Sequence, residues 1–101
     1  MNDEKEAGER RLAERRAHRL TLTDDVNKLM EALKRQSPEA WQSYRETVEQ
    51  EGIIESPTYN TILQTLFKLF PGRDTQGISD LLRRMLEMVR QELGNESGKE
   101  R

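Results

Sequence analysis

Large apolar side chains are concentrated in residues 56–93, on two segments that Pro71 and Gly72 separate. In the first segment they cover more than half of a helix circumference, which implies burial on several sides. They are Tyr59, Ile62, Leu63, Leu66, Phe67, Leu69 and Phe70. In the second segment they are Ile78, Leu81, Leu82, Met85, Leu86, Met88, Val89 and Leu93. Both runs have helical spacing, so we expect two helices here, the second ending at Gly94.

Two weaker helical patterns precede this region. Residues 9–20 are rich in the helix-forming residues Ala, Leu, Arg and Glu, but few of their side chains are apolar. Residues 24–35 carry a regular apolar face instead. It consists of Val26, Leu29, Met30 and Leu33. We therefore expect a helix in each segment.

The connection between these two helices has two interpretations. A threonine followed by two aspartates is typical of a helix start, which predicts a break near residues 21–23. Alternatively, apolar positions spaced by three and four residues would form the seam of one continuous helix. Because Arg15 and Arg19 interrupt that seam, we favour the break.

Two Ser-Pro pairs mark further helix starts, at Ser37 and at Ser56. In each pair the serine is suited to cap the helix, and the proline suits the first helical position, where its missing N–H costs nothing. We expect the first of these helices to run to about Gln50 and to be capped by Gly52. Its apolar positions are Trp41, Tyr44 and Val48. Ile53 and Ile54 follow in a short link, from which we expect them to fill the core.

The overall pattern predicts an all-α fold, because no stretch alternates apolar and polar residues with the period of a β-strand. We expect a small bundle of four to five helices in residues 9–93, as a single domain. Residues 1–8 and 94–101 are charged and contain no Leu, Ile, Val or Phe. We expect both termini to be flexible and disordered.

Composition narrows the class of protein. The formal net charge is −2 with acids and bases interleaved, which does not indicate a general nucleic-acid-binding surface. The chain has no cysteine, which excludes disulfides and agrees with a reducing compartment. No apolar run approaches the roughly 20 residues that cross a bilayer, and no apolar signal-peptide core follows the first residues. We expect a cytoplasmic protein with no membrane partner.

Residues suited to catalysis are scarce. The single histidine, His18, lies in the most charged segment, where no apolar surroundings would tune its chemistry. The nearest carboxylate, Glu14, has the spacing of an ordinary surface pair. No other carboxylate falls within an apolar helix face, where burial would adapt it to acid–base work. We expect no enzyme activity and no catalytic, cofactor or metal site.

Two sets of residues remain as candidates for binding. Five arginines against two glutamates give residues 9–20 a local charge of +3 with histidine neutral. Three of these arginines, four residues apart on one helix face, could grip phosphates or an acidic partner; they are Arg11, Arg15 and Arg19. The candidate protein interface lies on apolar helix faces. It comprises Trp41, Tyr44, Leu82, Met85, Met88 and Val89.

These features predict a non-enzymatic helical module for protein–protein interaction, an adaptor or assembly subunit that forms a homo-oligomer. A scaffold of this size without disulfides or metal commonly gains stability by oligomerising. The alternative is a nucleic-acid-binding accessory subunit that uses the arginine-rich first helix. No residue pattern identifies the protein partner.

Overall fold

The computed structural model describes the backbone of residues 3–99 and the side chains of residues 13–18 and 21–96. Within these residues the chain forms four α-helices and no strand. The helices are α1 (Asp3–Gln36), α2 (Pro38–Glu49), α3 (Ser56–Leu69) and α4 (Thr75–Lys99). The predicted all-α bundle is confirmed, with four helices.

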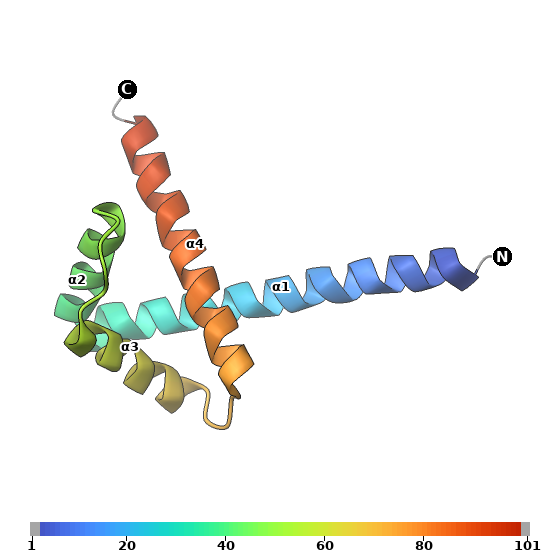
Figure 1. The fold of residues 1–101 in the computed structure, drawn as a ribbon, viewed down its shortest axis with the longest axis horizontal. Helices are drawn as coiled ribbons and strands as arrows, with labels where there is room; N and C mark the ends of the chain where they lie inside the picture. Colours follow the sequence, from blue (N-terminus) through green and yellow to red (C-terminus); the bar gives the residue numbers. More distant parts are fainter. Residues whose placement is uncertain (1–2, 100–101) are drawn as a thin grey trace.

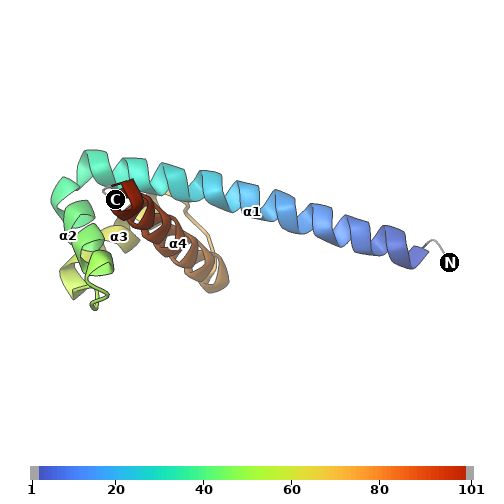
Figure 2. The ribbon, with the colours of Figure 1, turned by 90° about the horizontal axis from the view of Figure 1, so that it is seen from above.

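The C-terminal half of α1 is the element on which the bundle is built. α1 packs against each of the other three helices. Figure 2 shows all three on the same side of α1, and Figure 1 shows α4 crossing α1 in its C-terminal half. The N-terminal half of α1 extends beyond them as a lone helix. We call residues 9–20, which lie in this half, the basic arm.

All four helices contribute to one apolar core. Its buried members are Val26, Leu29, Met30, Leu33, Trp41, Tyr44, Val48, Ile62, Leu66, Leu81, Met85 and Val89. The spacing of three and four residues brings each set to one helix face, as in Leu81, Met85 and Val89 of α4. A fully buried side chain of this size contributes about 1.5–3 kcal/mol relative to an exposed one. The core therefore fixes the arrangement of the helices.

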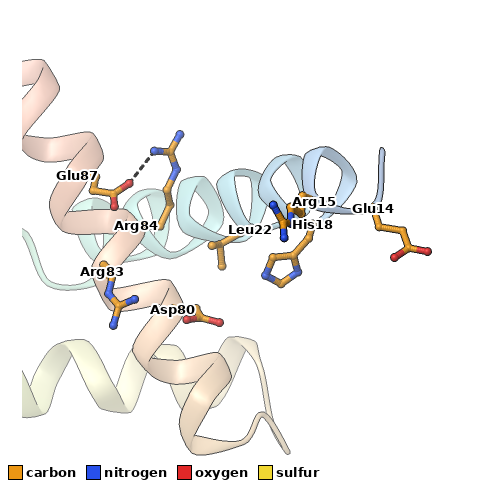
Figure 3. Close-up of a pocket in the computed structure, with 8 residues that line it drawn as sticks. All are labelled: Glu14, Arg15, His18, Leu22, Asp80, Arg83, Arg84 and Glu87. Atoms are coloured by element: carbon orange, nitrogen blue, oxygen red, sulfur yellow. Dashed lines mark hydrogen bonds and ion pairs between the residues drawn. The ribbon is translucent and has the colours of Figure 1, made fainter. Parts of the chain in front are cut away.

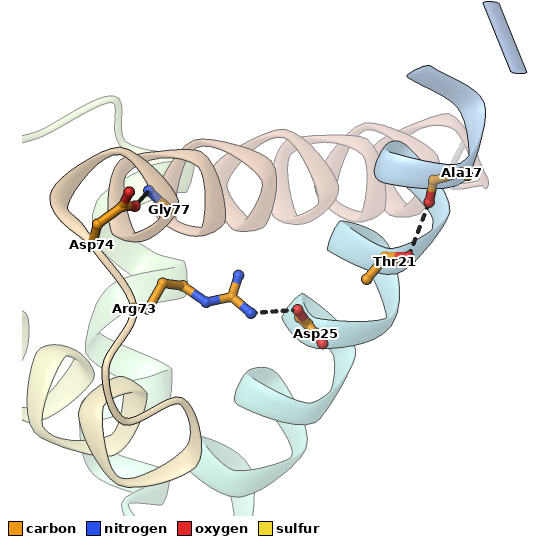
Figure 4. Close-up of polar contacts among 6 residues, drawn as sticks. All are labelled: Ala17, Thr21, Asp25, Arg73, Asp74 and Gly77. Atoms are coloured by element: carbon orange, nitrogen blue, oxygen red, sulfur yellow. Dashed lines mark hydrogen bonds and ion pairs between the residues drawn. The ribbon is translucent and has the colours of Figure 1, made fainter. Parts of the chain in front are cut away.

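The break expected at residues 21–23 is wrong, because α1 continues through them. The hydroxyl group of Thr21 donates a hydrogen bond of 3.0 Å to the carbonyl oxygen of Ala17 (Figure 4). This side chain therefore bonds to the preceding turn of the same helix and does not cap a new one. The next residue, Leu22, packs against the core. Both contacts favour a continuous helix.

The two Ser-Pro pairs begin helices, but neither serine caps through its side chain. Ser37 makes no side-chain capping bond; its N–H donates to the carbonyl oxygen of Leu33 at 2.8 Å. Its own carbonyl oxygen accepts from the N–H of Trp41 at 3.0 Å. The backbone hydrogen bonds of α1 thus continue into those of α2, as they do at a proline kink. In the second pair Ser56 is already helical, and Glu55 holds the N-cap position without a side-chain bond.

The capping residue after α2 lies one position before Gly52, where we expected it. The residue with a positive φ is Glu51, at 55°, and not Gly52. The N–H of Glu51 donates to the carbonyl oxygen of Val48 at 3.1 Å, and the N–H of Gly52 donates to that of Thr47 at 2.9 Å. This pair of hydrogen bonds is a Schellman motif. In this motif the residue with the left-handed φ, here Glu51, comes directly before the second donor, here Gly52.

The α2–α3 connection separates its two isoleucines. Ile54 is partly buried and packs against the core, as expected. Ile53 is 93% exposed, so the prediction that it fills the core is wrong. The two are adjacent in the link between α2 and α3, and only the side chain of Ile54 meets the core.

The two ends of α4 differ from each other in how they are held. At the start, the carboxylate of Asp74 accepts a hydrogen bond of 2.8 Å from the N–H of Gly77 (Figure 4). At the far end, α4 continues past Gly94, so the predicted stop there is wrong. Arg45 of α2 forms an ion pair of 3.0 Å with Glu96, which holds this extension against the bundle.

An ion pair fastens the α3–α4 connection to α1. The guanidinium group of Arg73 donates to the carboxylate of Asp25 at 2.8 Å (Figure 4). The same guanidinium lies 4.7 Å from the ring centroid of Phe70, at cation–π distance. Both contacts are only partly exposed to solvent. The connection is thereby held close to the middle of α1.

The first and last helices reach towards both ends of the chain. Residues 1–2 and 100–101 lie outside the described residues. Helix extends into both segments for which we expected disorder, residues 1–8 and 94–101, and that disorder stays a prediction. No helix in the described part of the chain is long and apolar enough to cross a membrane.

Candidate functional site

Most residues of the predicted protein interface belong to the core. Trp41, Tyr44, Met85 and Val89 have exposed fractions of 6%, 2%, 0% and 0%. The remaining two, Leu82 and Met88, are partly buried and pack against the same core. A side chain buried within its own chain contacts a partner only if the bundle opens. The set stays a prediction, and its accessible part is limited to Leu82 and Met88.

The pKa of Tyr44 indicates that the core excludes water. Burial raises the pKa of the Tyr44 phenol from 10.0 to about 12, although the charge of Arg90 acts in the opposite direction. The ring of Tyr44 stacks on that of Trp41 with a centroid distance of 5.9 Å. A phenol with this pKa stays protonated near neutral pH. Its position therefore suits packing, and gives no reactive phenolate.

The described side chains of the basic arm are exposed to solvent. Every side chain in residues 13–18 is exposed, including the candidate contact Arg15. The side chains of the other two candidates, Arg11 and Arg19, lie outside the described side chains. Their backbone is part of α1, one turn before and one turn after Arg15. In Figure 1 and Figure 2 this part of α1 extends beyond the bundle, and its C-terminal end faces α4.

A charged hollow of about 700 Å³ lies where α1 leaves the bundle and passes α4 (Figure 3). It is lined by Glu14, Arg15, His18 and Leu22 of α1 and by Asp80, Arg83, Arg84 and Glu87 of α4. Arg84 donates to the Glu87 carboxylate at 3.1 Å and to the Thr23 hydroxyl at 3.2 Å. The lining mixes three acids with three arginines, so it does not select an ion of one sign.

The charged hollow does not have the set of ligands that a metal centre needs. No group of three or more His, Cys, Asp or Glu side chains in the described part of the chain could hold a metal ion. His18 is exposed, as its sequence context predicted. The chemistry that these surfaces offer is therefore charge pairing and apolar contact.

A second, more apolar hollow of about 790 Å³ lies between the end of α2, the α2–α3 connection, α3 and α4. It is lined by Val48, Ile53, Ile54, Tyr59 and Leu86, with Glu51, Gly52 and Arg90. Two of these apolar side chains are exposed, Ile53 at 93% and Tyr59 at 40%. We call this the apolar hollow. Sequence reasoning missed it, because adjacent isoleucines after a helix resemble core residues.

The apolar hollow adjoins a strongly acidic surface. Residues 39–55 contain five glutamates against one basic residue, Arg45, which is already paired with Glu96. All five glutamates are exposed; they are Glu39, Glu46, Glu49, Glu51 and Glu55. We call them the acidic edge. The first three recur at spacings of seven and three residues, which places them on one face of α2. Counting charge by segment would have found this edge in the sequence, since it opposes the +3 of the basic arm.

Comparison with known proteins adds no family to this description. No family model matches the chain, and no curated protein or solved structure is significantly similar to it. The fold and its surfaces define a class only: a small helical bundle with a projecting basic helix, an acidic edge and an apolar hollow beside that edge. A function is therefore proposed from the chemistry of these surfaces.

Proposed function

We propose that the protein is a non-enzymatic helical module for protein–protein interaction, an adaptor or assembly subunit that associates with further copies of itself. The observation that carries the proposal is the apolar hollow, with Ile53 93% exposed at its rim. Covering a fully exposed isoleucine contributes about 1.5–3 kcal/mol. A hollow with an exposed aliphatic and an exposed aromatic residue has the character of a binding site for a protein segment.

The absence of an enzyme activity is part of this proposal. The charged groups that line the two hollows are exposed or hold an ion pair or a hydrogen bond, and in the described part of the chain the strongly raised pKa is that of the core residue Tyr44. Catalytic groups are typically desolvated and aimed at a shared reacting atom. The lack of cysteine agrees with a reducing compartment, and the proposal places the module in the cytoplasm.

A nucleic-acid-binding accessory subunit is the second candidate. Exposed arginines on a projecting helix favour it, with Arg15 and Arg16 as described examples. However, the chain carries a formal net charge of −2, and the acidic edge would repel the same polymer. We therefore rank this candidate below the interaction module.

A substitution at Ile53 tests the leading proposal. Ile53→Gln should weaken self-association about tenfold, because the complex loses apolar burial at the hollow. The free energy of unfolding of the monomer should change by less than about 0.5 kcal/mol, since the side chain contacts almost nothing in its own chain. Sedimentation velocity from about 1 µM to about 1 mM would measure the dissociation constant.

Phe67→Gln is the matched control. Phe67 is also large, apolar and exposed, at 49%, but it does not line the hollow. The proposal expects Phe67→Gln to leave the dissociation constant unchanged. Wild-type protein that sediments at its 11.9 kDa monomer mass over the whole range would remove self-association. An effect of Phe67→Gln as large as that of Ile53→Gln would assign binding to the outer face of α3 and refute the hollow.

A further inference from the structure

We infer that the occupant of this surface is the basic arm of a second copy, which lies along the acidic edge and covers the apolar hollow. The inference rests on the proposed self-association and adds its partner segment and its geometry. Every side chain in residues 13–18 of the arm is exposed, and so are all five glutamates of the edge.

Charge complementarity is the first support. The basic arm has a local charge of +3, from five arginines and two glutamates. Residues 39–55 have a local charge of −4, from five glutamates and one arginine. Exposed ion pairs contribute only about 0.2–1 kcal/mol each, but opposite surfaces of this kind speed encounter and fix orientation. The two surfaces attract each other far more than either attracts itself.

The two charged stripes also match in length. Along a helix that rises 1.5 Å per residue, Arg11 to Arg19 span about 12 Å, and Glu39 to Glu49 span about 15 Å. Residues 3–6 contribute three acids and one lysine at the tip of α1. A register that pairs the two stripes carries this acidic tip past the end of the edge, where repulsion is small.

The contact must form between two molecules. In Figure 1 the arm and α2 lie at opposite ends of α1, and the unbroken helix between them keeps the arm from folding back. Two copies related by a two-fold axis would place each arm along the other copy's α2, with the two α1 helices crossing steeply, because α2 runs across the line of α1 in Figure 1 and Figure 2. Such a dimer is closed and contains the contact twice.

Apolar contact supplies the affinity that surface charges lack. The acidic edge runs directly into Ile53 and towards Tyr59, at 93% and 40% exposure. The arm carries leucine or alanine at positions 12, 13, 17 and 20, among its arginines. A helix of this composition fits a helix-in-groove contact, with apolar anchors inside and charges at the rim. The arm thereby gains the burial that its own bundle does not give it.

Charge reversal on each surface provides the test. Arg15→Glu with Arg16→Glu changes the local charge of the arm from +3 to −1, and Glu39→Lys with Glu46→Lys and Glu49→Lys changes that of residues 39–55 from −4 to +2. All five residues are exposed, so both variants should fold. Each alone places like charges in contact and should raise the dimer dissociation constant about tenfold or more. An equimolar mixture of the two variants should form a heterodimer, because each arm then meets an edge of opposite sign.

Lys28→Glu with Lys68→Glu is the matched control. It removes the same amount of positive charge as the arm variant, at two exposed sites outside the arm. The inference expects this control to dimerise as the wild type does in sedimentation velocity at about 0.15 M salt. All samples are run with and without nuclease.

The outcomes separate the inference from the proposed function. Variants that dimerise like the wild type, or a mixture that does not, overturn the arm–edge contact and leave self-association standing. A control that weakens the dimer equally shows a net-charge effect and also overturns it. Assembly lost after nuclease assigns the arm to nucleic acid. A wild type that stays monomeric removes both the contact and self-association.

Discussion

The two halves of α1 share one backbone conformation but have opposite surroundings. In the C-terminal half, Val26, Leu29 and Leu33 are fully buried. In the N-terminal half, every side chain of residues 13–18 is exposed. Helix propensity from Ala, Leu, Arg and Glu suits both halves to a helix, whereas only the second carries an apolar face. Helix formation and docking thus depend on different features of the same sequence.

The largest effect should come from truncating the core on the packed half. Leu29→Ala removes a side chain with 0% exposure and leaves a cavity, so the free energy of unfolding should fall by about 2–5 kcal/mol. Arg16→Ala on the arm should change it by less than about 0.5 kcal/mol. Urea titration followed by circular dichroism would measure both values. Equal losses at the two sites would show that the arm folds as part of the bundle.

The sequence predicted the parts of the fold that depend on repeated side chains. Apolar spacing located the helices after Pro38, Pro57 and Gly72, together with the core positions of α4. It failed where one polar contact decides between two local conformations. The hydroxyl group of Thr21 bonds within α1 and does not start a helix, and Ser37 leaves capping to backbone bonds.

The candidate site was harder to predict than the fold. An apolar residue on a helix face could serve as core or interface, and tertiary packing made Trp41, Tyr44, Met85 and Val89 core. The exposure of Ile53 depends on the direction of one side chain in a short link, which no periodicity encodes. The charges of the arm were readable from sequence. Their opposition to the acidic edge became meaningful only when the structure placed the two at opposite ends of α1.

A second prediction uses Tyr44 to measure how completely the packed half excludes water. The phenol has a pKa of about 12 in the folded chain and about 10 when unfolded, so the unfolded state loses its proton first as pH rises. The resulting stability is fully present below pH 10 and is lost as pH rises through 12. The loss should be on the order of 3 kcal/mol.

Tyr44→Phe is the control for this titration, because it keeps the ring in the core and removes the ionisable group. The difference in unfolding free energy between wild type and Tyr44→Phe should therefore shrink or invert between pH 10 and pH 12. Urea midpoints at several pH values would follow it. A constant difference across this window would mean that water reaches the phenol.

The smallest effect, and the most direct comparison, comes from one substitution made in each half of α1. Ala32→Gly and Ala13→Gly change the same residue type in the same helix, at 7% exposure in the bundle and at an exposed arm position. Glycine costs about 1 kcal/mol in a helix interior because it loses more backbone freedom on folding. Ala32→Gly should lower the free energy of unfolding by about 1–2 kcal/mol, since a buried methyl group is lost as well.

Ala13→Gly should instead reduce helical ellipticity and leave the unfolding midpoint of the bundle unchanged, because local opening of the arm breaks no core contact. The two glycine variants should be compared in a protein that also carries Arg15→Glu and Arg16→Glu, because our inference expects the arm to be undocked there. In the wild-type background at high concentration, the same Ala13→Gly substitution should weaken dimerisation, since the arm must then be helical to lie along α2. A midpoint shift in the undocked background would mean that both halves of α1 unfold as one cooperative unit.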